Sequence, residues 1–148
     1  MIQDASAAEQ EKKNFAKSVI SNNLIWGLAS SKGFIKANSV EYEDTQVIPF
    51  WSNEDDAALA INKGWENYKP ASMPVSEFLE NWLVGMYNEG MLVGINWSNN
   101  SPKVELEPLE LALEIANQLI EQGKELKLTK YNDVEHYQEQ VKNILEQD

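Results

Sequence analysis

The stretch that decides the fold is Val47-Ile48-Pro49-Phe50-Trp51 and the chain that follows it, down to Phe78-Leu79-Glu80-Asn81-Trp82. Its pattern predicts a strand that ends near a proline and two aromatic residues, then a short helix, an aromatic loop and an aromatic-rich helix. The stretch holds three of the five Trp and three of the five Pro of the chain. It contains no recognisable reactive group, so the sequence says more about architecture than about activity.

Hydrophobic periodicity extends this pattern in both directions along the chain. Stripes at helical spacing predict helices, and short alternating runs bounded by turn residues predict strands. The predicted helices are residues 8–20, 52–61, 75–87, 109–122 and 134–145, and the predicted strands are residues 24–28, 33–37, 46–50, 91–97 and 103–106. The fold class is therefore expected to be α+β: a single domain with an antiparallel sheet of about five short strands, helices packed mainly on one face, and a C-terminal amphipathic helix.

Turn and capping signals divide the chain further. Residues 1–7 are predicted as a leader, residues 8–123 as the core, and residues 124–148 as a C-terminal arm and helix. Helix starts that resemble capping boxes occur over residues 52–55 and 132–135. Residues 65–73 are predicted as a loop whose aromatic side chains pack back on the body, and residues 98–102 as a turn.

The charge balance restricts the partners. Twelve Lys face 24 Asp and Glu, the net charge is −12, and the sequence has no Arg. Such a chain repels nucleic acid, nucleotides and anionic lipid, and it lacks the guanidinium group that best clamps phosphate. Two interpretations stay open: the charge provides solubility, or it attracts a basic protein.

Further absences indicate a cytoplasmic protein. Cysteine is missing, which excludes disulfides and thiolate chemistry and fits a reducing compartment. No apolar run is long enough for a membrane span, and the first residues do not resemble a signal peptide. We therefore expect no membrane partner.

Candidate catalytic and metal-binding residues are few. His136 is the only histidine, and its place at the start of the last predicted helix favours an exposed side chain over a general base. Two acidic clusters, over residues 41–44 and 54–56, lack the alternating ligands and glycine of a calcium loop. No nucleophile elbow or phosphate-binding glycine loop is present. The sequence predicts no catalytic residue, no metal and no cofactor, and it favours a non-catalytic protein.

The aromatic residues are the remaining candidates for a site. They can form the core that joins sheet to helices, or they can line a groove for an extended peptide, and their helical spacing favours the core. The candidate binding surface comprises Trp51, Trp65, Tyr68, Trp82 and Trp97. Among these, Trp97 is expected to be the one that is partly exposed.

A spaced set of Trp and Pro residues resembles a known family. The set is Ile25-Trp26-Gly27-Leu28, Gly33-Phe34, Ile48 through Ser52 with Ala57, Trp65, Tyr68-Lys69-Pro70, Phe78 through Leu83, Val104 and Glu107-Pro108-Leu109. It resembles the bacterial domain-of-unknown-function 2750 family over about residues 15–119, with Ser52 where the family usually has proline and Pro74 where it usually has serine. The resemblance implies a short, acidic, cytoplasmic protein that shares the fold of this family. It implies no activity, because none is attached to the family.

Two functions are therefore weighed. The first is a non-catalytic protein-interaction module that binds a basic partner, one form being an immunity-type protein that neutralises a basic toxin. The alternative is a small-molecule-binding protein or a carboxylate-based enzyme, with a pocket between the sheet and the helix over residues 75–87 and Glu80 as a candidate acid. The narrow apolar stripe of the last helix can either pair with a second copy in a homodimer or lie on its own domain.

Overall fold

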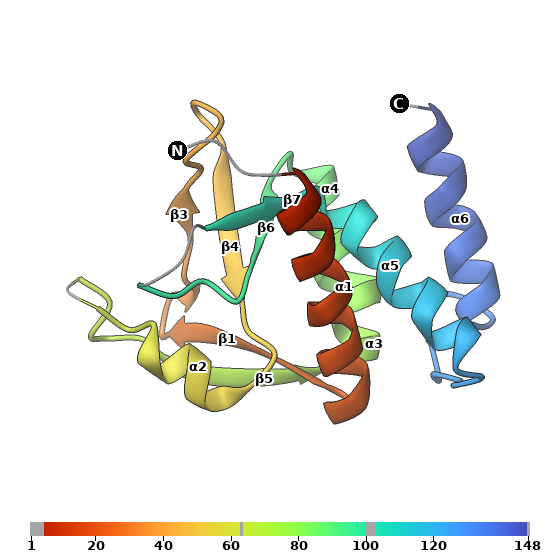
Figure 1. Cartoon of the computed structure of the whole chain (residues 1–148), viewed down its shortest axis with the longest axis horizontal. Coiled ribbons are helices and arrows are strands. Elements are labelled where there is room, and N and C mark those ends of the chain that lie inside the picture. The colour runs from red at the N-terminus through yellow and green to blue at the C-terminus, as the bar shows by residue number, and fades with distance from the viewer. Residues whose placement is uncertain (1–4, 63, 100–102, 148) are drawn as a thin grey trace.

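Residues 47–51 join the two β-sheets of the computed structural model, which describes residues 5–62, 64–99 and 103–147 (Figure 1). Trp26 belongs to the first sheet, and its backbone exchanges two hydrogen bonds with that of Trp51, at 2.9 and 2.7 Å. Trp51 follows directly after a strand of the second sheet. The stretch that we expected to organise the chain is therefore the covalent and hydrogen-bonded link between its sheets.

The two sheets have different topologies. The first has the order β2-β1-β5, with both pairs antiparallel, and is built from β1 (Leu24–Ser30), β2 (Gly33–Phe34) and β5 (Lys69–Pro74). The second has the order β3-β4-β6-β7 and is built from β3 (Ala37–Asn38), β4 (Gln46–Phe50), β6 (Leu92–Ile95) and β7 (Val104–Leu106). Within it the central pair, β4 and β6, is parallel, and the outer pairs are antiparallel.

Most helices cover one side of the sheets, and α2 lies on the other side (Figure 1). The helical segments are α1 (Ala5–Asn22), α2 (Glu54–Leu59), α3 (Val75–Glu77), the π-helix η1 (Phe78–Leu83), α4 (Val84–Asn88), α5 (Pro108–Glu121) and α6 (Val134–Gln147). The last helix packs along α5, at the end of the molecule farthest from β3 (Figure 1). Within the described ranges no helix combines the length and the apolarity that a membrane crossing needs.

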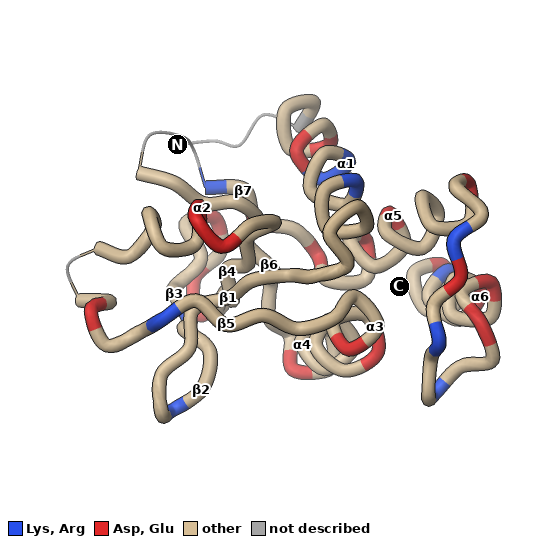
Figure 2. Tube along the Cα trace, turned by 90° about the horizontal axis from the view of Figure 1, so that it is seen from below, with Lys and Arg blue, Asp and Glu red and all other residues tan. Residues whose placement is uncertain are grey.

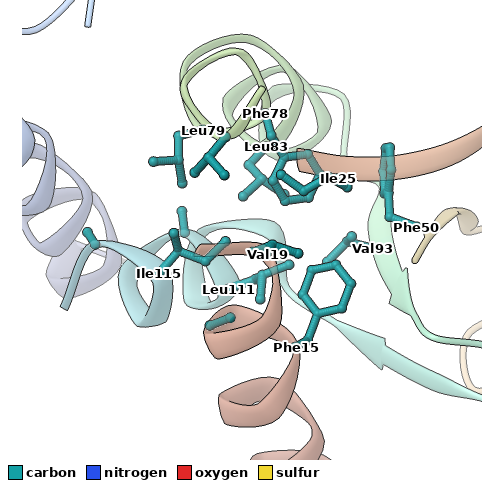
Figure 3. Close-up of a cluster of buried hydrophobic side chains, with 14 of the residues drawn as sticks. Phe15, Val19, Ile25, Phe50, Phe78, Leu79, Leu83, Val93, Leu111 and Ile115 are labelled. Atoms are coloured by element: carbon teal, nitrogen blue, oxygen red, sulfur yellow. The ribbon is translucent and has the colours of Figure 1, made fainter. Parts of the chain in front are cut away.

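The main core lies between the sheets and the helices on the covered side. Phe15 and Val19 of α1, Phe50 and Val93 of the second sheet, and Phe78 of η1 meet there (Figure 3). A second, smaller cluster lies under α2, and Trp51, Ala57, Leu92 and Trp97 belong to it. Burying apolar surface on both faces of the second sheet is what fixes its position, because each buried side chain gains roughly 1.5–3 kcal/mol from leaving water.

The predicted α+β class and the C-terminal helix are confirmed, but the expected single sheet of about five strands is replaced by two sheets, of three and four strands. Residues 69–73, expected to be loop, belong to β5, which pairs with residues 24–29 of β1. The chain between β4 and β6 crosses over through β5 and the helix of residues 75–88, which makes that pair parallel rather than antiparallel. Helix α1 begins at Ala5, inside the predicted leader, and part of the turn predicted over residues 98–102 lies outside the described residues.

The C-terminal stripe lies on its own domain. Val134, Tyr137 and Val141 are at most 2% exposed and belong to the main core. Helices α5 and α6 are in extensive contact. These three side chains pack within the chain, and pairing of this helix with a second copy stays a prediction.

Candidate functional site

A pocket of about 490 Å³ lies between the β1–β2 hairpin and the helix of residues 75–88. This volume falls in the range of roughly 300–1,000 Å³ typical of small-molecule sites. The lining residues come from the hairpin, from β4 and from the helix: Lys32, Gly33, Phe34, Lys36, Ile48, Asn81, Trp82, Gly85, Met86 and Glu89. We call it the Phe34–Trp82 pocket. It occupies the place that the sequence suggested for a small-molecule site.

The apolar wall of this pocket is an aromatic contact. The rings of Phe34 and Trp82 meet edge to face with centroids 4.7 Å apart, and Phe50 continues the series into the core, 6.2 Å from Trp82. Gly27 makes the position of Phe34 available, because a Cβ atom on Gly27 would lie 2.5 Å from the ring. Both Phe34 and Trp82 stay half-buried, so the wall remains accessible from solvent.

The π-helix decides which side chains of this helix face the pocket. A π turn needs more residues than an α turn and therefore rotates the following side chains around the helix axis. Phe78, Leu79 and Leu83 are fully buried, whereas Trp82 and Asn81 line the pocket. Regular α-helical spacing over residues 75–87 predicts Trp82 on the same buried stripe as Leu79 and Leu83, and the π-helix changes this. π-Helices occur frequently at functional sites.

Glu80, the candidate acid, points away from the pocket and holds the C-terminal arm. Its carboxylate is 5% exposed and accepts hydrogen bonds from the backbone N–H groups of Thr129 and Lys130, at 2.9 and 2.7 Å. Glu105 is also 5% exposed and accepts from Ser39 Oγ and from the Val40 N–H. Each of these carboxylates is bonded to the backbone of a loop, which is a structural role.

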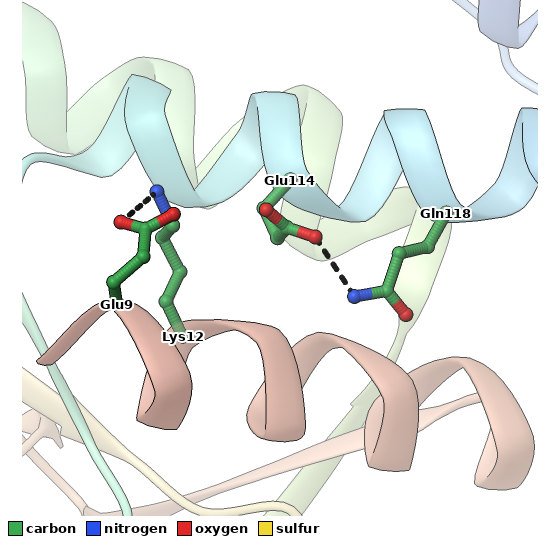
Figure 4. Close-up of polar contacts among 4 residues, drawn as sticks. All are labelled: Glu9, Lys12, Glu114 and Gln118. Carbon is green, nitrogen blue, oxygen red and sulfur yellow. Dashed lines mark hydrogen bonds and ion pairs between the residues drawn. The ribbon is translucent and has the colours of Figure 1, made fainter. Parts of the chain in front are cut away.

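A second candidate surface is acidic and lies around the N-terminal ends of α1 and α5. Three adjoining hollows share lining residues there, of about 250, 570 and 550 Å³. We define the acidic surface as Glu9, Glu41, Tyr42, Glu43, Glu107, Glu110 and Glu114. Lys12 lies among them and pairs with Glu9 at 3.0 Å, and Gln118 donates to Glu114 at 2.9 Å (Figure 4).

The loop of residues 39–45 gives the acidic surface its apolar part. Val40 and Tyr42 are 59% and 58% exposed; the other exposed large hydrophobic side chain among the described residues is Leu59 of α2, at 75%. The Ser39 hydroxyl accepts from the N–H groups of Glu41 and Tyr42 and donates to Glu105, so the loop is held in one conformation. An exposed aromatic residue surrounded by charges resembles the anchor of a protein–protein interface.

Four of the five aromatic residues predicted as a binding surface meet in the second core cluster, and the fifth, Trp82, lies elsewhere. Trp51 is fully buried and donates to the Trp97 carbonyl at 2.8 Å. Trp97, expected to be partly exposed, is 3% exposed, because its indole packs over Gly94 and donates to the Val104 carbonyl at 2.9 Å. Trp65 and Tyr68 pack on the second core cluster, as predicted for that loop. Only Trp82 contributes to the Phe34–Trp82 pocket.

The other polar candidates have local structural roles. His136 is half-buried rather than exposed. Its ring Nδ1 accepts from the backbone N–H of Asn132, and its backbone N–H donates to the Asp133 carboxylate. The clusters over residues 41–44 and 54–56 are exposed. Among the described residues no group of three or more His, Cys, Asp or Glu side chains is arranged to hold a metal ion.

The comparison with known families matches most of the chain. A family described as proteins of unknown function, DUF2750, matches residues 12–115. The chain belongs to the DUF2750 family. No curated protein and no solved structure matches it.

The part matched to DUF2750 includes every residue of the Phe34–Trp82 pocket and most of the acidic surface. It ends within α5, so the arm that Glu80 holds and the whole of α6 lie beyond it. Ser52 and Pro74, the two positions expected from the sequence to differ from the family's pattern, adjoin helix starts. Ser52 directly precedes the N-cap Asn53, and Pro74 is an N-cap without a side-chain hydrogen bond.

Proposed function

We propose that this DUF2750 protein is a non-catalytic interaction module that binds a basic protein through the acidic surface. The observation that carries the proposal is the exposed Tyr42 between Glu41 and Glu43, on a loop fixed by Ser39 and Glu105. Charge complementarity of this kind accelerates association with a basic partner, and an exposed aromatic side chain supplies buried area at the centre of the contact. An immunity-type protein that neutralises a basic toxin is one form of this function, and a cytoplasmic location, favoured by the absence of Cys, agrees with it.

The experiment is affinity capture with the full chain as bait, at about 0.05 M and about 0.5 M salt. We expect a basic protein to be retained at low salt and lost at high salt, because the Debye length shrinks from roughly 14 Å to roughly 4 Å. The variant Glu41→Lys/Glu43→Lys should lose the partner at both concentrations. Glu135→Lys/Glu139→Lys, which makes the same charge change on exposed positions of α6, is the matched control and should keep it.

Capture that is indifferent to salt, or equal for the two double variants, would contradict the role of the acidic surface. Circular dichroism of both variants checks that each is folded. A Tyr42→Ala variant separates the apolar contribution from charge, and it should weaken binding without changing the salt dependence.

The second candidate function is small-molecule binding, and the observation that favours it is the Phe34–Trp82 pocket. The enzymatic form of this alternative has little support, because Glu80 is bonded to the backbone of residues 129 and 130 and does not line the pocket. The second candidate function is therefore small-molecule binding without catalysis.

A further inference from the structure

The residues that line the Phe34–Trp82 pocket carry more positive than negative charge, unlike the chain as a whole. The sequence has two acidic residues for each Lys, whereas the pocket lining has Lys32 and Lys36 against Glu89 alone. Figure 2 shows blue on the trace at the β2 hairpin and red along the helix of residues 75–88, so the positive charge of the rim comes from the hairpin. Neither Lys32 nor Lys36 forms an ion pair within the described ranges.

Neutral donors add to these two ammonium groups. Lys130 donates to Asn81 Oδ1 at 2.6 Å, which leaves the Asn81 amide nitrogen as a donor. The indole N–H of Trp82 has no acceptor among the residues that the structure describes, whereas those of Trp51 and Trp97 are both bonded to carbonyls. The pocket thus joins unpaired donors to an aromatic wall.

We propose that the Phe34–Trp82 pocket binds a small organic monoanion, an aromatic carboxylate, with its ring on the Phe34–Trp82 wall and its carboxylate near Lys32 and Lys36. The inference rests on the second candidate function and is independent of the acidic surface. A single negative charge is favoured over a polyphosphate for two reasons. The net charge of −12 repels multiply charged ligands, and Lys side chains act as separate point charges without the bidentate geometry of Arg.

Gly85 offers a way to close the pocket without disturbing the fold. It lies in α4 with helical backbone geometry and lines the pocket, and a Cβ atom placed on it meets no atom within 4 Å. Gly85→Leu therefore projects a side chain into the cavity, and Gly85→Ala adds one methyl group only. Both replacements also raise helix propensity.

The test is a titration with three probes of matched shape: phenylacetate, 2-phenylethanol and phenethylamine. Binding is followed by NMR through the Trp82 indole N–H and the amide groups of Gly33 and Gly85. We expect phenylacetate to bind most tightly and phenethylamine most weakly. The double variant Lys32→Gln/Lys36→Gln should lower the affinity for phenylacetate about three- to tenfold and leave the affinity for 2-phenylethanol unchanged. Lys124→Gln/Lys127→Gln, on exposed positions of the arm, is the charge-matched control.

The outcomes separate the pocket from its charge preference. If no probe shifts these signals at millimolar concentration, or if Gly85→Leu binds phenylacetate as well as Gly85→Ala does, the pocket is not a binding site and both the inference and the second candidate function are overturned. If all three probes bind equally to wild type and not to Gly85→Leu, small-molecule binding stands and the monoanion preference is overturned. Thermal unfolding of Gly85→Leu at or above the wild-type temperature excludes loss of fold as the cause.

Discussion

At the scale of residues, the buried acids of this protein hold loops. Glu80 fixes residues 129–130 against η1, and Glu105 fixes residues 39–40 against β7. A carboxylate that accepts two or more N–H bonds is satisfied although it is buried, and removing such an acceptor leaves the N–H groups unpaired. The loop that Glu105 holds carries Glu41, Tyr42 and Glu43 of the acidic surface, and the arm that Glu80 holds places Lys130 on Asn81, which lines the Phe34–Trp82 pocket.

The substitution Glu80→Gln should lower the free energy of unfolding by about 1–3 kcal/mol. The amide oxygen can replace Oε1, which accepts from both backbone N–H groups, but the NH₂ group replaces Oε2, and it cannot accept from the N–H and the hydroxyl of Thr129. Urea unfolding measures the effect. Glu77→Gln, on an exposed position of the same helix, is the control and should change stability by less than about 0.5 kcal/mol. Equal stability of the two variants would show that the Glu80 bonds contribute nothing net.

The buried phenol of Tyr137 predicts how the free energy of unfolding changes at alkaline pH. Burial, and next to it the charges of Tyr131 and Glu80, raises the pKa of Tyr137 far above its usual value. The phenol therefore keeps its proton in the folded state and donates to the Leu79 carbonyl at 2.7 Å. Above about pH 10 the unfolded chain releases this proton and the folded chain does not. The stabilising contribution is complete below that pH and declines as the pH rises.

Urea unfolding between about pH 9 and about pH 11 measures this decline. Wild type should lose up to about 1.4 kcal/mol more per pH unit than Tyr137→Phe does, since the variant lacks the titrating group. Tyr42→Phe, at a position that is 58% exposed, is the control and should follow the wild-type slope. Parallel slopes for wild type and Tyr137→Phe would contradict the link.

At the scale of elements, the apolar stripes were predictable, and the capping residues of α2 and α6 were displaced by one residue. The stripe of α1 is buried as expected, since helical spacing depends only on which residues are apolar. The predicted capping box over residues 52–55 begins at Asn53, which accepts from the Asp56 N–H at 2.8 Å and donates to its carboxylate. The start predicted over residues 132–135 moves likewise to Asp133. Ser, Asn and Asp all cap well, so adjacent candidates cannot be ranked by type.

The displaced cap is itself testable. Asn53→Ala should destabilise the protein by about 1 kcal/mol, because it leaves the Asp56 N–H without its acceptor. Asp55→Ala, in the same exposed turn, should cost no more than the few tenths of a kcal/mol that a charge contributes to the helix dipole. Thermal unfolding of both variants decides whether the helix is capped by Asn53 or by the capping box predicted over residues 52–55. A larger loss for Asp55→Ala would restore the register predicted from the sequence.

The sequence suggested the place of the pocket, but neither strand β5 nor the residues that line the pocket were predictable from it. The six residues of β5 include two prolines and a lysine, and their composition indicates a loop. They form a strand because β5 is at a sheet edge, and Pro70 and Pro74, four residues apart, turn their nitrogens to the same side. The lysines of the pocket rim flank Gly33-Phe34 in the sequence, but only the hairpin and the π-helix bring them to Trp82. These features depend on contacts between segments distant in the sequence.

At the scale of the whole molecule, charge and packing are separated in space. The apolar residues of both core clusters are enclosed by elements from the entire chain, including α6. Acidic side chains are distributed over the outside, and Lys12–Glu9 is the ion pair found within the described part of the chain. The folded state therefore contains much electrostatic repulsion and little paired attraction.

This balance predicts that salt stabilises the protein. Raising sodium chloride from about 0.02 M to about 0.5 M shortens the range of repulsion between like charges on the surface, while it weakens few ion pairs. The midpoint of thermal unfolding should therefore rise with salt. The matched comparison is a variant in which four exposed acids become amides: Glu121→Gln, Glu125→Gln, Glu135→Gln and Glu139→Gln. This variant has a net charge of −8 and should respond less to salt, because it has less repulsion to screen. A midpoint that falls with salt would mean that attractive pairs hold this fold together and that its excess negative charge does not weaken it.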